Sequence, residues 1–125
     1  MRKVQPRSFS FDKNEALLKA AYEAFNKREI DAVLKLMTKD VHWPNGWEGG
    51  YLSGHDAVRE YWTRQWKEIN PTVTPVAIKP IPNGRYEVLV HQHIKDMKGT
   101  VLTDSEVKHI YTLENGLIKR MEIEK

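Results

Sequence analysis

The feature that most constrains this chain is a change of periodicity near Glu68. Before this residue, apolar side chains recur at the spacing of one helix face, and after it they alternate with polar residues as in strands. Two Asn-Gly pairs and one Asp-to-Gly turn separate the alternating segments, which makes these segments successive antiparallel strands. Helices followed by a meander of strands predict an α+β domain, with the helices on one face of a curved antiparallel sheet.

Three helices are expected in the first half and four strands in the second. Asp12 and Glu15 form a predicted capping box at the start of the first helix. The predicted helices cover 12–28, 30–37 and 55–68, with a short strand at 40–43 and a glycine-rich loop at 44–52 between the last two. The predicted strands cover 72–81, 85–95, 100–113 and 117–123, and prolines place the first of them at an edge or across bulges.

Length and composition predict one globular domain of the cytoplasm. The chain has 125 residues, which we divide into a tail, 1–11, and a single domain, 12–125. Its 20 Lys and Arg are interleaved with 17 Asp and Glu, so no basic block indicates a nucleic-acid partner. No apolar run approaches the roughly 20 residues that cross a membrane, and residues 1–7 show no export signal. The absence of cysteine excludes disulfides, thiolate metal sites and a cysteine nucleophile.

Strand periodicity assigns each side chain to a face of the sheet. If Asp96 pairs with Gly99, Tyr86 lies opposite His109, and the face that these two share is mostly apolar or small. This inner face is predicted to hold Tyr86, Val88, Val90, Gln92, Ile94, Val101, Thr103, Ser105, Val107, His109 and Tyr111. The outer face mixes apolar and polar groups, and we expect a homodimer through it. Its relevant residues are Leu89, His91, His93, Leu102 and Ile110.

The last hairpin, at Asn115-Gly116, allows two registers. A two-residue loop would place Ile118, Arg120 and Glu122 inside. A three-residue loop would place Leu117, Lys119, Met121 and Ile123 inside, and it is favoured because Met121 and Ile123 suit a core better.

His109 is the first candidate for chemistry, because an imidazole among apolar neighbours can act as an acid or a base near neutral pH. Tyr22 is the second candidate. Aromatic and amide side chains are expected to contact a flat, apolar ligand, although several of them would serve equally well as core. These ligand-binding candidates are Trp43, Trp47, Tyr61, Trp62, Tyr86, Gln92 and Tyr111. His91, His93 and Asp104 could approach one another, but they lie on the outer face, so no metal site is predicted.

Three segments and the order of the elements resemble the nuclear transport factor 2-like superfamily, in its SnoaL-like and ketosteroid isomerase-like branch. The segments are 24–31 (AFNKREID), 53–62 (SGHDAVREYW) and 111–118 (YTLENGLI), and the resemblance covers about residues 12–124. It implies a cone-shaped sheet wrapped around three N-terminal helices, with a pocket at the wide end. It also implies a small apolar molecule as partner, no cofactor, and a homodimer.

The same resemblance argues against ketosteroid isomerase activity. The positions of that enzyme's tyrosine, general base and protonated aspartate match Ala21, Trp43 and His109, while its third-helix aromatic matches Tyr61. Two functions remain open. One is a cofactor-free isomerase, cyclase or dehydratase that moves a proton on an apolar carbonyl compound, with His109 as acid or base and Tyr22 or Tyr61 as donor. The other is a non-catalytic ligand-sensing or dimerisation domain.

Overall fold

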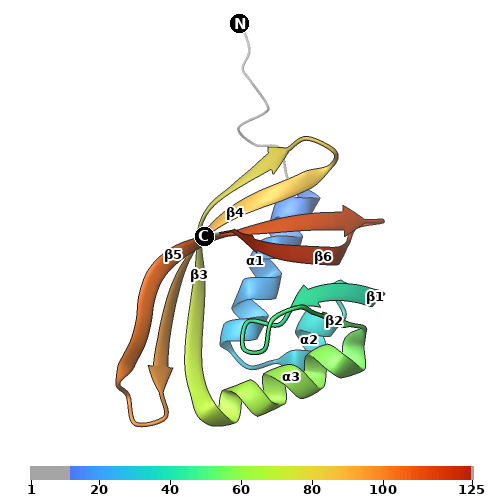
Figure 1. Cartoon of the computed structure of the whole chain (residues 1–125). Coiled ribbons are helices and arrows are strands. Elements are labelled where there is room, and N and C mark those ends of the chain that lie inside the picture. Colours follow the sequence, from blue (N-terminus) through green and yellow to red (C-terminus); the bar gives the residue numbers. More distant parts are fainter. Residues whose placement is uncertain (1–11, 125) are drawn as a thin grey trace, which may run out of the picture.

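A computed structural model describes residues 12–124, and the predicted tail, 1–11, lies outside them. Three helices and six strands make up the described part (Figure 1). The helices are α1 (Lys13–Asn26), α2 (Ile30–Leu34) and α3 (His55–Glu68). The strands are β1 (Met37–Pro44), β2 (Tyr51–Ser53), β3 (Ile69–Ile81), β4 (Arg85–Asp96), β5 (Val101–Glu114) and β6 (Leu117–Glu124). The predicted α+β architecture is therefore confirmed, and β2 is the one strand that the sequence did not indicate.

The six strands form one sheet in the order β2-β1-β6-β5-β4-β3. The last four strands form the expected antiparallel meander, but β1 runs parallel to β6, so the sheet is not antiparallel throughout. Strands β3, β4 and β5 bend along their length, α1 lies in the hollow they form, and α3 crosses one end of it (Figure 1). Within residues 12–124, no helix has the length and apolar character needed to cross a membrane.

The helix α1 begins where the sequence predicts. The Asp12 carboxylate accepts hydrogen bonds from the backbone N–H groups of Asn14 and Glu15, which satisfies two of the donors left free at a helix start. The end of the helix is tied to the edge strand β3. There, the Asn26 amide donates to the carbonyl oxygen of Val73 and accepts from its N–H, at 2.7 and 2.9 Å. This pairing fixes α1 against the sheet edge and occupies backbone groups that would otherwise be open to another strand.

The pairing of β4 with β5 differs from the predicted register by two residues. Tyr86 pairs with Tyr111, and Val88 pairs with His109. The difference has two sources. Asp96 accepts from the N–H of Gly99 but also donates to the carbonyl oxygen of Thr100, which moves the pairing by one residue, and a bulge between Ile94 and Lys95 moves it by another. Because side chains alternate with a period of two, this shift of two leaves the residues from Thr103 to Tyr111 on their predicted faces. Beyond the bulge, Val101 pairs with Lys95 of the outer face, so its predicted place on the inner face is wrong. His109 is accordingly inside.

The last hairpin combines features of both predicted registers. Glu114 pairs with Leu117 around a two-residue Asn115-Gly116 turn, in which both residues have positive φ. The favoured three-residue loop is therefore wrong. A bulge further along β6 restores the other phase, so that Ile118 near the turn and Met121 beyond the bulge are both buried.

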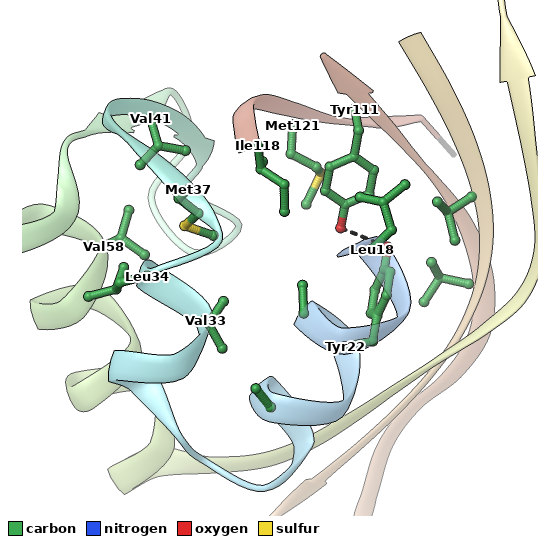
Figure 2. Packing of buried hydrophobic residues seen from close by; sticks show 14 of the residues in the cluster. Leu18, Tyr22, Val33, Leu34, Met37, Val41, Val58, Tyr111, Ile118 and Met121 are labelled. Carbon is green, nitrogen blue, oxygen red and sulfur yellow. Dashed lines mark hydrogen bonds between the residues drawn. The ribbon is translucent and has the colours of Figure 1, made fainter. Parts of the chain in front are cut away.

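The core lies between α1, α2, α3 and the concave face of the sheet. Figure 2 shows side chains of α1 meeting those of β5 and β6, with Tyr22 pointing towards Tyr111. The largest side chains with almost no exposed surface are Trp62 and Tyr111, followed by Leu18 and Ile118. This packing fills the part of the hollow beside α1, and a cavity remains beside α3.

Candidate functional site

A cavity of about 280 Å³ opens between α3, the inner faces of β4, β5 and β6, and the loop after β1. Its walls are aromatic and aliphatic, with a few neutral polar groups. They are formed by Phe25, Trp43, Pro44, Gly46, Trp47, Tyr61, Trp62, Gln65, Ile69, Gln92, Ile94, Val107, His109, Met121 and Ile123. This volume is near the lower limit of ordinary ligand pockets, which hold roughly 300–1,000 Å³.

Among the described residues, His109 is the one titratable nitrogen base on the cavity wall. Strand β5 presents it inwards between Val107 and Tyr111, and only 7% of its surface is exposed. Burial lowers the pKa of His109 from its ordinary value of 6.5 to about 4, because the charged imidazolium would lose its hydration there. The ring is therefore neutral at pH 7.

Two tyrosines form a hydrogen-bonded chain to His109 on the side of the ring away from the cavity. The Tyr22 hydroxyl lies 2.7 Å from His109 Nδ1, and the Tyr111 hydroxyl donates to the Tyr22 oxygen at 2.8 Å. Burial raises the pKa of both tyrosines, so both hydroxyl groups keep their protons. The ring of Tyr22 is also nearly parallel to that of His109, at 5.9 Å between centroids. Nδ1 is thus occupied, and Nε2 is the ring nitrogen left for a ligand.

Three aromatic rings form the floor of the cavity. Trp62 on α3 meets Trp43 edge to face at 5.6 Å, and Phe25 on α1 at 5.2 Å. Helical spacing on α3 places Tyr61, Trp62 and Gln65 on the side that faces the cavity, since residues three and four apart share a face. Flat apolar walls of this kind accommodate flat apolar ligands.

The loop between β1 and β2 forms the mouth of the cavity and is internally hydrogen-bonded. Asn45 organises it, because its side-chain oxygen accepts from the N–H groups of Trp47 and Glu48. The Tyr61 hydroxyl joins the loop to α3 by accepting from the N–H of Gly46 at 3.0 Å. Trp47 packs edge-on to Tyr61 and remains 42% exposed, at the rim of the cavity.

Most of the ligand-binding candidates from the sequence meet at this cavity, and three of the named tyrosines do not line it. Trp43, Trp47, Tyr61, Trp62, Gln92 and His109 all line it. Tyr22 and Tyr111 lie behind His109, where they line a smaller adjoining void of about 60 Å³. Tyr86 is on the predicted inner face but at the other end of the sheet, where its hydroxyl contacts the Asp12 carboxylate.

Sequence reasoning missed Gln65, Phe25 and Ile69 as wall residues. The sequence could have indicated Gln65, because this residue follows Tyr61 by one helical turn. In the structure its amide donates to the Tyr61 hydroxyl at 3.2 Å. Tyr51, at the start of β2, stacks on His42 at 4.3 Å and does not line the cavity.

None of the described residues that line the cavity is an Asp, Glu, Lys or Arg. His91 and His93 lie on the outer face with Asp104, as expected, and His91 Nε2 contacts the Asp104 carboxylate. In the part of the chain from 12 to 124, no three His, Asp or Glu side chains are grouped so that they could hold a metal ion. The chemistry available in the cavity is therefore that of neutral donors and acceptors.

The sequence matches the model of the SnoaL-like domain over residues 18–121. Similar solved structures include an NTF2-like protein of unknown function from Burkholderia pseudomallei, at 24% identity, with 90% of each chain covered and a TM-score of 0.79. TerC, co-crystallised with polyporic acid, has the same values.

Two further structures extend this comparison. Rv0760c from Mycobacterium tuberculosis, in complex with estradiol-17β-hemisuccinate, is 18% identical over 90% of this chain and 93% of its own, with a TM-score of 0.77. A putative polyketide cyclase from Xanthomonas campestris pv. campestris is 20% identical over 89% and 88%, with a TM-score of 0.78. At these identities the likeness shows the fold alone. No curated protein matches the chain in sequence.

Proposed function

Since this chain belongs to the SnoaL-like family, we propose that its cavity binds a small, flat, mainly apolar molecule with a few polar groups at its edge. The observation that carries this proposal is the open hollow itself. Trp43, Trp62 and Met121 line it without filling it, and it reaches His109, which has a free ring nitrogen. Similar folds solved with estradiol-17β-hemisuccinate and with polyporic acid support this class of ligand.

A blocking substitution tests the proposal. Ile94→Trp places a large ring at a half-buried wall position on β4, and we expect it to weaken binding of estradiol-17β-hemisuccinate about tenfold or more, since a filled cavity cannot hold the ligand. Val101→Trp is the matched control, because Val101 is an exposed apolar residue on β5 that does not line the cavity. Isothermal titration calorimetry measures both. Equal affinities for the two variants would contradict binding in this cavity.

Catalysis is the finer proposal for the same site. His109 supports cofactor-free proton-transfer chemistry on an apolar carbonyl compound, such as isomerisation, cyclisation or dehydration, because its neutral ring can donate a hydrogen bond to the carbonyl oxygen as charge develops there. The described walls carry no Asp or Glu to act as the base. Ketosteroid isomerase chemistry fits poorly, because Ala21 and Trp43 supply neither the hydroxyl donor nor the carboxylate base. A non-catalytic ligand-sensing domain uses the same cavity and predicts binding without turnover.

We also propose that the chain forms a homodimer through the outer sheet face. Leu102 on that face is 54% exposed; Asp104 follows it by two residues on β5 and contacts His91 of β4. Of the other two apolar residues predicted there, Leu89 is half-buried, and Ile110 is already buried in the single chain and adds little to an interface.

Light scattering on the eluting protein should give twice the 14.6 kDa of one chain. Leu102→Asp should shift this mass towards one chain, because a carboxylate at the centre of an apolar contact would lose its hydration. Substitution of Met97, which is exposed at the β4–β5 turn, should leave the mass unchanged. A single-chain mass for the unmodified protein at micromolar concentration would contradict the dimer.

A further inference from the structure

The hydrogen bonds behind His109 determine which of its ring nitrogens carries the proton. Three groups form a buried chain, in which the Tyr111 hydroxyl reaches the Tyr22 oxygen, and the Tyr22 hydroxyl reaches His109 Nδ1. Figure 2 shows the link between the two tyrosines. Tyr111 is 2% exposed and Tyr22 is 4% exposed, so bulk solvent does not reach their hydroxyl groups, and the other walls of the adjoining 60 Å³ void are mainly apolar.

Counting protons distinguishes the two tautomers of the ring. If Tyr111 donates to Tyr22 and Tyr22 donates to Nδ1, both hydroxyl protons have acceptors, and the ring proton sits on Nε2. If Nδ1 carries the proton, it must donate to Tyr22, and one of the two hydroxyl protons is then left without an acceptor among residues 12–124. A buried donor without a partner is costly, and the first arrangement avoids it.

We propose that Tyr111 and Tyr22 hold His109 as the Nε2–H tautomer, so that the cavity selects ligands that place a carbonyl, enolate or phenolate oxygen against this N–H. The inference rests on the proposed function, because it assumes that a small molecule enters this cavity. His109 then donates a hydrogen bond and keeps its proton. In any reaction at this site it stabilises negative charge on a ligand oxygen and is not the group that removes a proton.

A second wall residue points to the same ligand chemistry. The Tyr61 hydroxyl oxygen accepts from the Gly46 N–H and from the Gln65 amide, so its own proton needs another acceptor. No described side chain supplies that acceptor. These two donors, on walls whose described residues include no Lys or Arg, suit a ligand with two acceptor oxygens, and they give no advantage to a purely apolar ligand.

Nitrogen NMR tests the tautomer directly. Long-range proton–nitrogen correlation on the full chain with ¹⁵N-labelled histidine should show His109 protonated at Nε2 at pH 7. Tyr22→Phe removes the one partner that the residues from 12 to 124 offer to Nδ1, and we expect a mixture of tautomers in that variant. Tyr86→Phe is the control, since this hydroxyl contacts Asp12 at the other end of the sheet and should leave the His109 signals unchanged. An Nδ1–H tautomer, or an imidazolium, in the unmodified protein would overturn the inference.

Two isosteric probes test the ligand class. Fluorenone and fluorene are both flat and tricyclic, and they differ by one carbonyl oxygen. We expect fluorenone to bind about tenfold more tightly, a ratio typical of one well-formed hydrogen bond. Tyr22→Phe should reduce that ratio, and Tyr86→Phe should not. Equal binding of the two probes overturns the ligand class but leaves the proposed function intact. If neither probe binds, both the ligand class and the proposed function are contradicted. The tautomer is tested separately, by the NMR measurement.

Discussion

Lowering the pH from 7 to 5 is expected to reduce the free energy of unfolding by about 2 kcal/mol through His109 alone. The pKa of this ring is about 4 in the folded protein and 6.5 in an exposed chain. As the pH falls below 6.5, His109 binds a proton in the unfolded chain but not in the folded protein, so the free energy of unfolding decreases. The loss develops between pH 6.5 and about 4, and below that range it levels off near 3 kcal/mol.

The comparison that isolates His109 is with His109→Gln. This variant keeps an acceptor for the Tyr22 hydroxyl but has no titrating ring. It should therefore lose about 2 kcal/mol less than the unmodified protein between pH 7 and pH 5, whatever its stability at pH 7. Urea unfolding at several pH values measures both proteins, and the contributions of all other titrating groups cancel in the difference. Parallel pH curves would show that His109 is not buried as a neutral ring.

The sequence assigned His109 to the correct face of the sheet even though the predicted register of β4 against β5 was wrong. The predicted pairing of β4 with β5 was displaced by two residues, because neither the Asp96–Thr100 closure nor the bulge after it leaves a local signal. Face assignment depends only on whether a displacement is odd or even. An error of one residue would have placed His109 on the outer face, and an error of two did not.

Alternation along a strand could not predict which inner-face residues line the cavity, because that depends on how far along the strand each residue lies. Tyr86 and Gln92 share the inner face, yet only Gln92 lines the cavity, because α1 and its cap cover the sheet at Tyr86. Where the helices end over the sheet depends on packing between distant segments. The parallel contact of β1 with β6 and the short strand β2 are long-range features of the same kind. The pairing of Tyr22 with His109 joins residues 87 positions apart, which no local pattern shows.

Replacing Trp62 by alanine should be the most destabilising change in the cavity wall. The sequence left this residue open between core packing and ligand contact. It is 2% exposed, and its indole stacks on Trp66 and meets Phe25 and Trp43 edge to face. Removing such a ring leaves a void next to the existing cavity and costs about 3–5 kcal/mol. This is a large part of the roughly 5–15 kcal/mol by which domains are usually stable.

Trp47→Ala is the matched comparison, because Trp47 carries the same ring at the rim of the same cavity. It is 42% exposed and its described ring contact is with Tyr61, so its loss should change the free energy of unfolding by about 1 kcal/mol or less. Its effect should appear in ligand affinity, since the ring covers the mouth of the cavity. Denaturant unfolding and calorimetric titration of both variants separate the two roles. Similar losses of stability for Trp62→Ala and Trp47→Ala would contradict the division between a structural floor and a ligand-covering rim.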